Sequence, residues 1–203
     1  MKKFATLFLS AIVPAVFAAG FTEKFSGSDL PQESWMHYQF VRCSGVDYVK
    51  PLNGKLVLNG LKKPGKAASA ALERDACFTS GNVHWRMYAE LGKNTKNGSY
   101  TWNLLSDNGE RQLGVTLASQ DGKWVLTGVA GHTCSPKTVT VYTVKNSAVK
   151  VEIIRKNGAY QLLCNGKCFY TAEGDTATIA SIRLTVQGNA QMTVSSMSLE
   201  KIK

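Results

Sequence analysis

The sequence predicts an all-β protein, a sandwich or barrel of antiparallel strands, on two grounds. Turn signals that combine glycine with asparagine or aspartate recur about every 8–12 residues, the spacing of short strands in such folds. The segments between them alternate apolar and polar residues with the period of two that a half-buried strand shows. Because no long segment keeps its apolar residues at helical spacing, we expect little helix.

The segment 158–171 shows this pattern most plainly. Asn165-Gly166 supplies the two positive-φ positions of a type I′ turn, whose twist matches that of the strands on either side. A two-residue loop fixes the register, and adjacent pairs alternate faces. Cys164 and Cys168 are therefore expected on opposite sides of the hairpin, which argues against a local disulfide or a zinc knuckle. The expected pairs are Cys164 with Lys167, Leu163 with Cys168, and Leu162 with Phe169.

The other strands follow in order along the chain. The segment 54–60 is bounded by glycines, and 83–90 alternates over its whole length. The Ala-rich segment 66–77 fits a short helix or a strand of small residues equally well. Further strands are expected at 100–104, at 113–118 after Asp107-Asn108-Gly109, at 123–127 after Asp121-Gly122, and at 138–144, 149–155, 179–186 and 191–202.

Residues 1–19 are expected to be a secretory signal peptide and not part of the fold. An apolar run follows Lys2-Lys3 and ends in small residues that fit cleavage after Ala18 or Ala19. The run is shorter than the roughly 20 residues that a membrane span needs. We therefore expect a protein exported to the periplasm, cell surface or medium, with a single domain at 20–203 and no membrane span.

The charge balance is basic. The chain carries 24 basic and 14 acidic residues, a formal net charge of +10, which becomes +8 without Lys2 and Lys3. An excess of this sign favours anionic glycans, cell-envelope polymers or nucleic acid as partners. The basic residues are scattered, with no run longer than Lys62-Lys63, so the excess also fits a soluble surface and indicates no specific nucleic-acid partner.

All five cysteines lie beyond residue 19, which fits an oxidising compartment. The simplest count is two disulfides and one free thiol. The preferred pairs are Cys134 with one of the hairpin cysteines, and Cys43 with Cys77. A catalytic cysteine is the alternative, because His132 and Cys134 share one face if that segment is extended. Nothing further supports a cysteine nucleophile, so structural cysteines are the simpler interpretation.

Four short motifs stand out: Phe25-x₄-Leu30-Pro31-x₃-Trp35, Asn53-Gly54-Lys55-Leu56-Val57-Leu58, Leu163-Cys164-Asn165-Gly166-Lys167 and Thr193–Leu199. Together they resemble bacterial domains of the concanavalin A-like lectin/glucanase superfamily, which includes laminin G-like domains. The resemblance implies a two-sheet antiparallel jelly-roll sandwich whose final strand returns beside the first. Lectins and glycanases share this fold, and a structural Ca²⁺ ion is common in it. The sequence itself shows no cofactor motif and no calcium loop.

One acidic motif bears on enzymatic activity. A retaining glycanase needs two carboxylates about 5 Å apart, and laminarinase-like members of the superfamily carry them on an E-x-D-x-x-E strand. The nearest match here, Glu73-Arg74-Asp75, lacks the third acid and comes early in the chain. We interpret it as an acidic surface pair flanking Arg74 and predict no catalytic residue and no metal ligand.

The segment 83–90 is the strongest candidate for a binding surface. If its apolar set faces the core, a polar row forms on the other face, consisting of His84, Arg86, Tyr88 and Glu90. An aromatic ring flanked by hydrogen-bonding side chains is the usual chemistry of a sugar site. Neighbouring strands are expected to extend the row through Asn103, Thr101, Gln112 and Thr116. An ordinary solvated sheet face alternates in the same way, and that interpretation stays open.

The tryptophans are assigned to packing. Trp85 and Trp102 lie on apolar faces, and the resemblance makes Trp35 a packing residue, with a contact at the rim of a site as the alternative. The sequence thus favours an exported, non-catalytic module that binds carbohydrate, such as a cell-envelope polysaccharide. The alternatives are a glycan-acting hydrolase of the same superfamily and an envelope or adhesion domain that binds protein.

Overall fold

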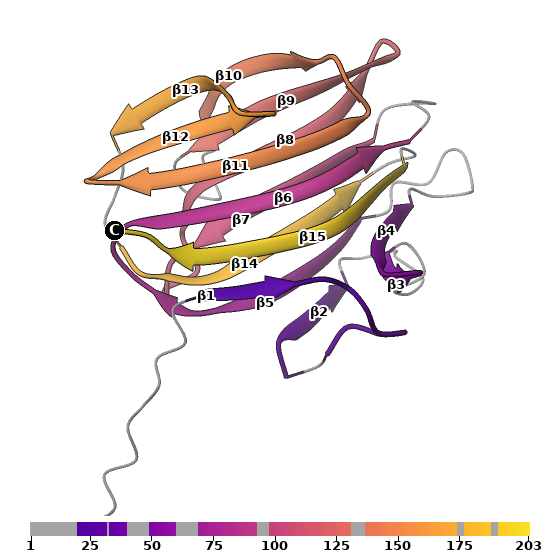
Figure 1. Cartoon of the computed structure of the whole chain (residues 1–203), viewed down its shortest axis with the longest axis horizontal. Helices are drawn as coiled ribbons and strands as arrows, with labels where there is room; N and C mark the ends of the chain where they lie inside the picture. Colours follow the sequence, from indigo (N-terminus) through magenta and orange to yellow (C-terminus); the bar gives the residue numbers. More distant parts are fainter. Residues whose placement is uncertain are drawn as a thin grey trace, which may run out of the picture.

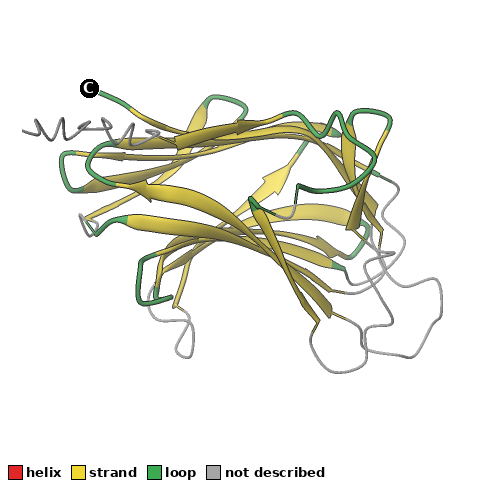
Figure 2. Ribbon diagram, turned by 90° about the horizontal axis from the view of Figure 1, so that it is seen from below, coloured by secondary structure: helices red, strands yellow, loops and turns green. Residues whose placement is uncertain are grey.

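The computed structural model describes residues 20–31, 33–39, 49–59, 69–92, 98–130, 137–173, 177–187 and 191–203. These residues form two antiparallel sheets, which lie one above the other in Figure 2. The predicted all-β sandwich is therefore confirmed for the described residues. They include no helix that is long and apolar enough to cross a membrane. The expected signal peptide lies outside them.

One sheet has eight strands: β1 (Gly20–Glu23), β3 (Val49–Leu52), β4 (Lys55–Asn59), β6 (Val83–Leu91), β11 (Ala148–Lys156), β12 (Ala159–Cys164), β13 (Lys167–Glu173) and β15 (Gln191–Lys201). Their order in this β6 sheet is β13-β12-β11-β6-β15-β4-β3 (Figure 1). The first strand, β1, pairs with the C-terminal half of β15. The final strand thus returns beside the first, as the resemblance implied.

The other sheet, the β7 sheet, has seven strands: β2 (Trp35–Gln39), β5 (Ser69–Thr79), β7 (Ser99–Leu105), β8 (Arg111–Gln120), β9 (Lys123–Ala130), β10 (Lys137–Val144) and β14 (Ile179–Gln187). Their order is β10-β9-β8-β7-β14-β5-β2. β5 settles the open question about 66–77, because residues 69–77 belong to a strand. Its pairing with both β14 and β2 supplies the tertiary contacts that the alanine-rich sequence alone does not.

Four two-residue turns set the register of the hairpins. Both central residues have positive φ at Asn53-Gly54, Asp121-Gly122, Asn157-Gly158 and Asn165-Gly166. This is the type I′ conformation, which asparagine, aspartate and glycine adopt with least strain. The turn predicted at Asn165-Gly166 is confirmed, with φ values of 50° and 77°.

The hairpin after this turn departs from the expected register at one residue. The pairs Cys164–Lys167 and Leu163–Cys168 are confirmed, but Leu162 lies opposite Tyr170 and not Phe169. A β-bulge inserts Phe169, whose ring stacks on Tyr142 of β10 at a centroid distance of 5.5 Å. The bulge therefore aims an aromatic ring at the edge strand of the opposite sheet.

The tryptophans fill the interior, as expected. Trp85 of β6 and Trp102 of β7 are fully buried and pack with ring centroids 6.1 Å apart, so they join the two sheets. Trp35 is also buried and packs against Phe25. Its assignment as a packing residue is confirmed, and the alternative of a rim contact is wrong.

The hairpin cysteines lie on opposite faces, as predicted. Cys164 is buried, Cys168 is exposed, and both are free thiols. The preferred bridge from Cys134 to the hairpin is therefore wrong for this structure, because Cys164 points into the core and Cys168 contacts Tyr170 and Thr171. The second proposed pair, Cys43 with Cys77, involves side chains outside the described part of the chain and stays a prediction.

Candidate functional site

The polar row predicted on β6 exists. Val83, Trp85, Met87 and Ala89 are buried, and the residues between them point away from the core: His84, Arg86, Tyr88 and Glu90. Tyr88 is 39% exposed, which makes it one of three large hydrophobic side chains that the described residues leave exposed. Alternation on one strand is thus sufficient to place an aromatic ring and three ionisable groups on one outer face.

Neighbouring strands add further polar side chains to this face. Lys150 of β11 lies opposite Tyr88, and Glu152 lies opposite Arg86. On the other side, Glu200 of β15 lies opposite His84. Because paired residues point to the same side of a sheet, these side chains form one surface. We call it the Tyr88 face, and it comprises Lys55, His84, Arg86, Tyr88, Glu90, Lys150, Glu152, Ser195 and Glu200.

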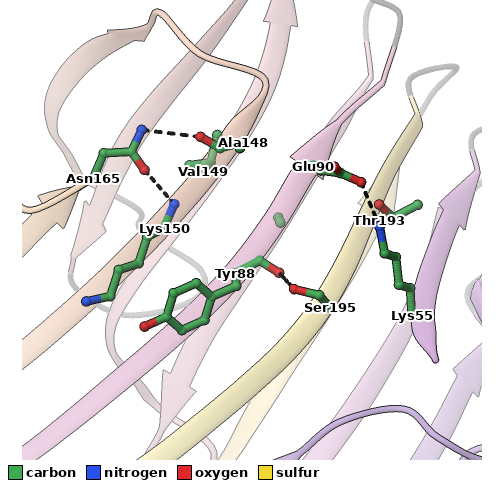
Figure 3. A pocket seen from close by; sticks show the side chains of 10 residues that line it. Lys55, Tyr88, Glu90, Ala148, Val149, Lys150, Asn165, Thr193 and Ser195 are labelled. Carbon is green, nitrogen blue, oxygen red and sulfur yellow. Dashed lines mark hydrogen bonds and ion pairs between the residues drawn. The ribbon is translucent and has the colours of Figure 1, made fainter.

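A pocket of about 340 Å³ lies on the Tyr88 face. Figure 3 shows that its side chains come from strands on both sides of β6. A β-bulge at Ser195 of β15 turns this serine so that its hydroxyl donates to the carbonyl oxygen of Tyr88. The polar and aromatic side chains that line the pocket include Lys55, Tyr88, Glu90, Lys150, Asn165 and Ser195.

Lys150 marks one end of the pocket. Its Nζ lies 5.6 Å from the centroid of the Tyr88 ring and 2.9 Å from Oε2 of Glu152. The hydrogen bond to Glu152 raises the pKa of Lys150, so its ammonium stays charged. Glu152 is only 4% exposed, so the carboxylate that holds Lys150 lies beneath the surface.

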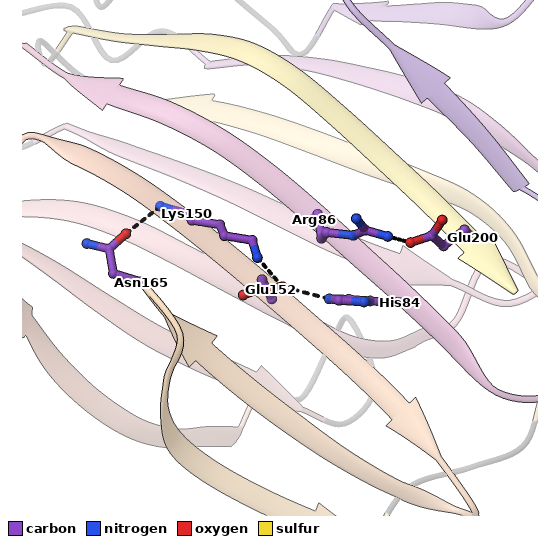
Figure 4. Close-up of polar contacts among 6 residues, drawn as sticks. All are labelled: His84, Arg86, Lys150, Glu152, Asn165 and Glu200. Carbon is purple, nitrogen blue, oxygen red and sulfur yellow. Dashed lines mark hydrogen bonds and ion pairs between the residues drawn. The ribbon is translucent and has the colours of Figure 1, made fainter. Parts of the chain in front are cut away.

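The same carboxylate oxygen has a second partner. Nε2 of His84 lies 2.7 Å from Oε2 of Glu152 (Figure 4). Burial lowers the pKa of His84, and the nearby charges of Arg86 and Lys150 lower it further, although the hydrogen bond to Glu152 opposes them. The neutral imidazole therefore donates Nε2–H to Glu152. Arg86 forms a separate ion pair with Glu200 of β15.

The other end of the pocket has an exposed ion pair. Nζ of Lys55 lies 2.8 Å from Oε2 of Glu90, with side chains 43% and 62% exposed, and this contact lowers the pKa of Glu90. Asn165 has a different role, because its Oδ1 accepts the backbone N–H of Lys150 and its Nδ2 donates to the carbonyl of Ala148. The Asn165 side chain therefore fixes the hairpin against β11, and the ligand-facing hydrogen-bonding groups of the pocket are those of other residues.

Asn103 does not extend this row, so that prediction is wrong. It lies on β7, in the opposite sheet, and is 7% exposed. Thr101, Gln112 and Thr116 lie on the same opposite sheet. The chain crosses from one sheet to the other between β6 and β7, whereas the prediction assumed that consecutive strands pair.

The acidic motif on β5 also differs from its interpretation as a surface pair. Glu73 is 8% exposed and accepts hydrogen bonds from Oγ of Ser181 and Nε of Arg183, at 2.5 and 2.9 Å. Its cationic partner is thus Arg183 of β14, across the sheet, and not Arg74. Glu73 and Asp75 line a second pocket, of about 310 Å³, on the outer side of the β7 sheet.

Metal binding finds no support in the described side chains. Across the described ranges, no group of three or more His, Cys, Asp or Glu side chains is placed to hold a metal ion.

No protein-family model matches the sequence, and no curated protein matches it. Solved structures do match. A native glycosidic hydrolase is 12% identical, with 91% of this chain and 97% of that chain covered and a TM-score of 0.71. The β-glucanase of Bacillus licheniformis is 10% identical, with 91% and 99% covered and a TM-score of 0.67. The CBM2 module of the evolved Dit of Lactobacillus casei BL23 phage J-1 is 10% identical, with 89% and 94% covered and a TM-score of 0.64.

These matches show that the chain has the concanavalin A-like lectin/glucanase fold. The resemblance noted in the sequence is thereby confirmed at the level of the fold. At identities of 10–12% the likeness carries no residue roles to this chain.

Proposed function

We propose that this protein binds carbohydrate through the Tyr88 face. The observation that carries the proposal is the pocket in which the exposed Tyr88 ring lies between the hydrogen-bonding side chains of Lys150 and Glu90. An aromatic ring offers its face to the C–H groups of a sugar, and the polar side chains hydrogen-bond to its hydroxyls. These are the two kinds of contact that a sugar needs.

The layout of the face supports binding over simple solvation. Glu152 holds Lys150 near the ring, and the turn at Asn165 fixes the strand that carries Lys150. Side chains held in this way lose less conformational freedom when a ligand binds. The fold supports the same class of ligand, because a glycosidic hydrolase, a β-glucanase and a CBM2 module share it. Together with the expected signal peptide at residues 1–19, this leads us to propose that the protein is an exported carbohydrate-binding module.

A glycan array on the purified protein tests the proposal, followed by affinity measurements on the best ligand. Tyr88→Ala should weaken binding by about 1–3 kcal/mol, the range for losing an aromatic contact and its buried area. Gln112→Ala, on the opposite sheet, should leave the affinity unchanged. Loss of binding in Gln112→Ala with full affinity in Tyr88→Ala would move the site to the β7 sheet. An empty array would favour the protein-binding alternative.

A second candidate function is hydrolysis of a glycan at the pocket beside β5. The observation that favours it is that Glu73 and Asp75 share one face of a strand and one pocket. It ranks second because the Glu73 carboxylate is already engaged by Ser181 and Arg183. Release of reducing sugar from a bound glycan, abolished by Asp75→Asn, would establish the hydrolase. Binding without turnover would leave the binding module.

A further inference from the structure

We infer, on the basis of the proposed function, that the ligand of the Tyr88 pocket is an anionic saccharide whose acidic group binds Lys150. The inference comes from where the charges lie. Lys55 and Lys150 both line the pocket, but of their two carboxylate partners only Glu90 does. A ligand in the pocket therefore meets two ammonium groups and one carboxylate.

Lys150 is built to keep a donor free for a ligand. Its side chain is 35% exposed, whereas that of Glu152 is 5% exposed, so the ion pair points its ammonium end outward. An ammonium has three N–H donors, and the hydrogen bonds of Lys150 to Glu152 and to Tyr88 leave one for the pocket. Because Nζ lies 5.6 Å from the Tyr88 ring centroid, a sugar ring stacked on Tyr88 brings its substituents to this ammonium. A carboxylate or sulfate there gains a charge-assisted hydrogen bond.

The carboxylate that does line the pocket is easily displaced. Both side chains of the Lys55–Glu90 ion pair are exposed, and exposed ion pairs contribute little to stability. An anionic ligand can therefore take the place of Glu90 on Lys55 at small cost. The protein as a whole adds a long-range attraction, since its formal net charge is +10, or +8 without Lys2 and Lys3 of the expected signal peptide.

Polysaccharides that differ only in charge test the inference. Polygalacturonate is compared with its methyl ester, and dextran sulfate with dextran, at one fixed ionic strength because salt screens exposed charges. We expect the protein to bind at least one charged member roughly tenfold more tightly than its neutral partner. The first pair reports on carboxylates and the second on sulfates, so the two sources of negative charge are distinguished.

Variants separate a specific contact from general attraction. In Lys150→Gln, the affinities for the charged and the neutral polysaccharide of a pair should differ by no more than about twofold. Lys150→Arg should keep the preference for the charged polysaccharide, because it keeps the positive charge. Lys123→Gln removes the same charge from an exposed position on the β7 sheet and should leave the preference for charged polysaccharides unchanged. Equal losses in Lys150→Gln and Lys123→Gln would overturn the inference, because the attraction would then be non-specific.

The outcomes for the inference and for the proposed function are distinct. Tyr88-dependent binding of neutral saccharides, without preference for charged ones, would contradict the inference that the ligand is anionic. It would still support the proposed carbohydrate-binding function. No binding to any saccharide, charged or neutral, would overturn both. Thermal unfolding of each variant serves as the folding control. We expect Lys150→Gln to stay folded, because its side-chain amide retains a donor for Glu152.

Discussion

Trp85 and Trp102 meet at the centre of the sandwich, with ring centroids 6.1 Å apart, while Arg86, the next residue on β6, lies on the outer face. This contrast predicts that substitutions on the two faces of β6 reduce stability by very different amounts. Trp85→Ala should reduce the free energy of unfolding by about 3–5 kcal/mol, because it leaves a cavity between the sheets. Tyr88→Ala, on the outer face, should reduce it by less than about 1 kcal/mol.

Urea unfolding of the two variants measures both values. Equal losses of stability would show that β6 is covered on both sides, which would remove the open face on which the proposed function depends. Met87→Ala is a useful companion, because Met87 is fully buried on the same strand without contributing a ring to the tryptophan pair.

Gly114 of β8 lies opposite Asn103 of β7, and the lack of a side chain at 114 is what admits the Asn103 amide. A Cβ at 114 would overlap Oδ1 of Asn103 and the carbonyl oxygen of Trp102. Gly114→Ala should therefore cost about 1–3 kcal/mol of stability, the usual range for overpacking. Because the overlap is with two groups, Asn103→Ala should relieve only part of the cost in the double variant. Full additivity of the two substitutions in urea unfolding would contradict this arrangement.

The two hairpin thiols should differ sharply in reactivity. Cys168 is exposed, whereas Cys164 is 2% exposed and burial raises the pKa of its thiol to about 11. The thiolate is the reactive form, so Cys168 should react with a thiol reagent in the native protein and Cys164 only after unfolding. Peptide mapping of protein labelled before and after denaturation measures this. Recovery of either cysteine in a disulfide would contradict the free thiols of the structure.

The sequence was sufficient for those features that depend on local chemistry. Asn165-Gly166 specifies its turn because both residues tolerate positive φ, and the alternation from Val83 places Tyr88 on the outer face. Lys55 and Lys150 were missed, because they reach the pocket that Tyr88 lines only through the strand order β11-β6-β15-β4. That order joins segments far apart in the chain, and no local pattern encodes it. The misplacement of Asn103 has the same cause, since its strand belongs to the opposite sheet.

His84 should make stability depend on pH in the acidic range. The groups that face it are Glu152 and Lys150 of β11, Arg86 of its own strand, and Glu200 opposite it on β15. Burial is the largest influence, and the native pKa lies below the ordinary value of 6.5. The unfolded chain therefore binds a proton before the native protein does. The contribution of His84 to stability is therefore fully present above pH 6.5 and is lost as the pH falls through the lower native pKa.

His84→Gln isolates this contribution, because an amide still donates to Glu152 but does not titrate. We expect the free energy of unfolding to fall more steeply for the wild-type protein than for the variant between about pH 7 and about pH 5. Urea unfolding at the two pH values gives the change in the free energy of unfolding for each protein. Because the other titrating groups are common to both proteins, the difference between these two changes reports on His84. A steeper fall in the variant would mean that Glu152 outweighs burial and raises the pKa of His84. Equal slopes would mean that His84 has the same pKa in the native and unfolded states.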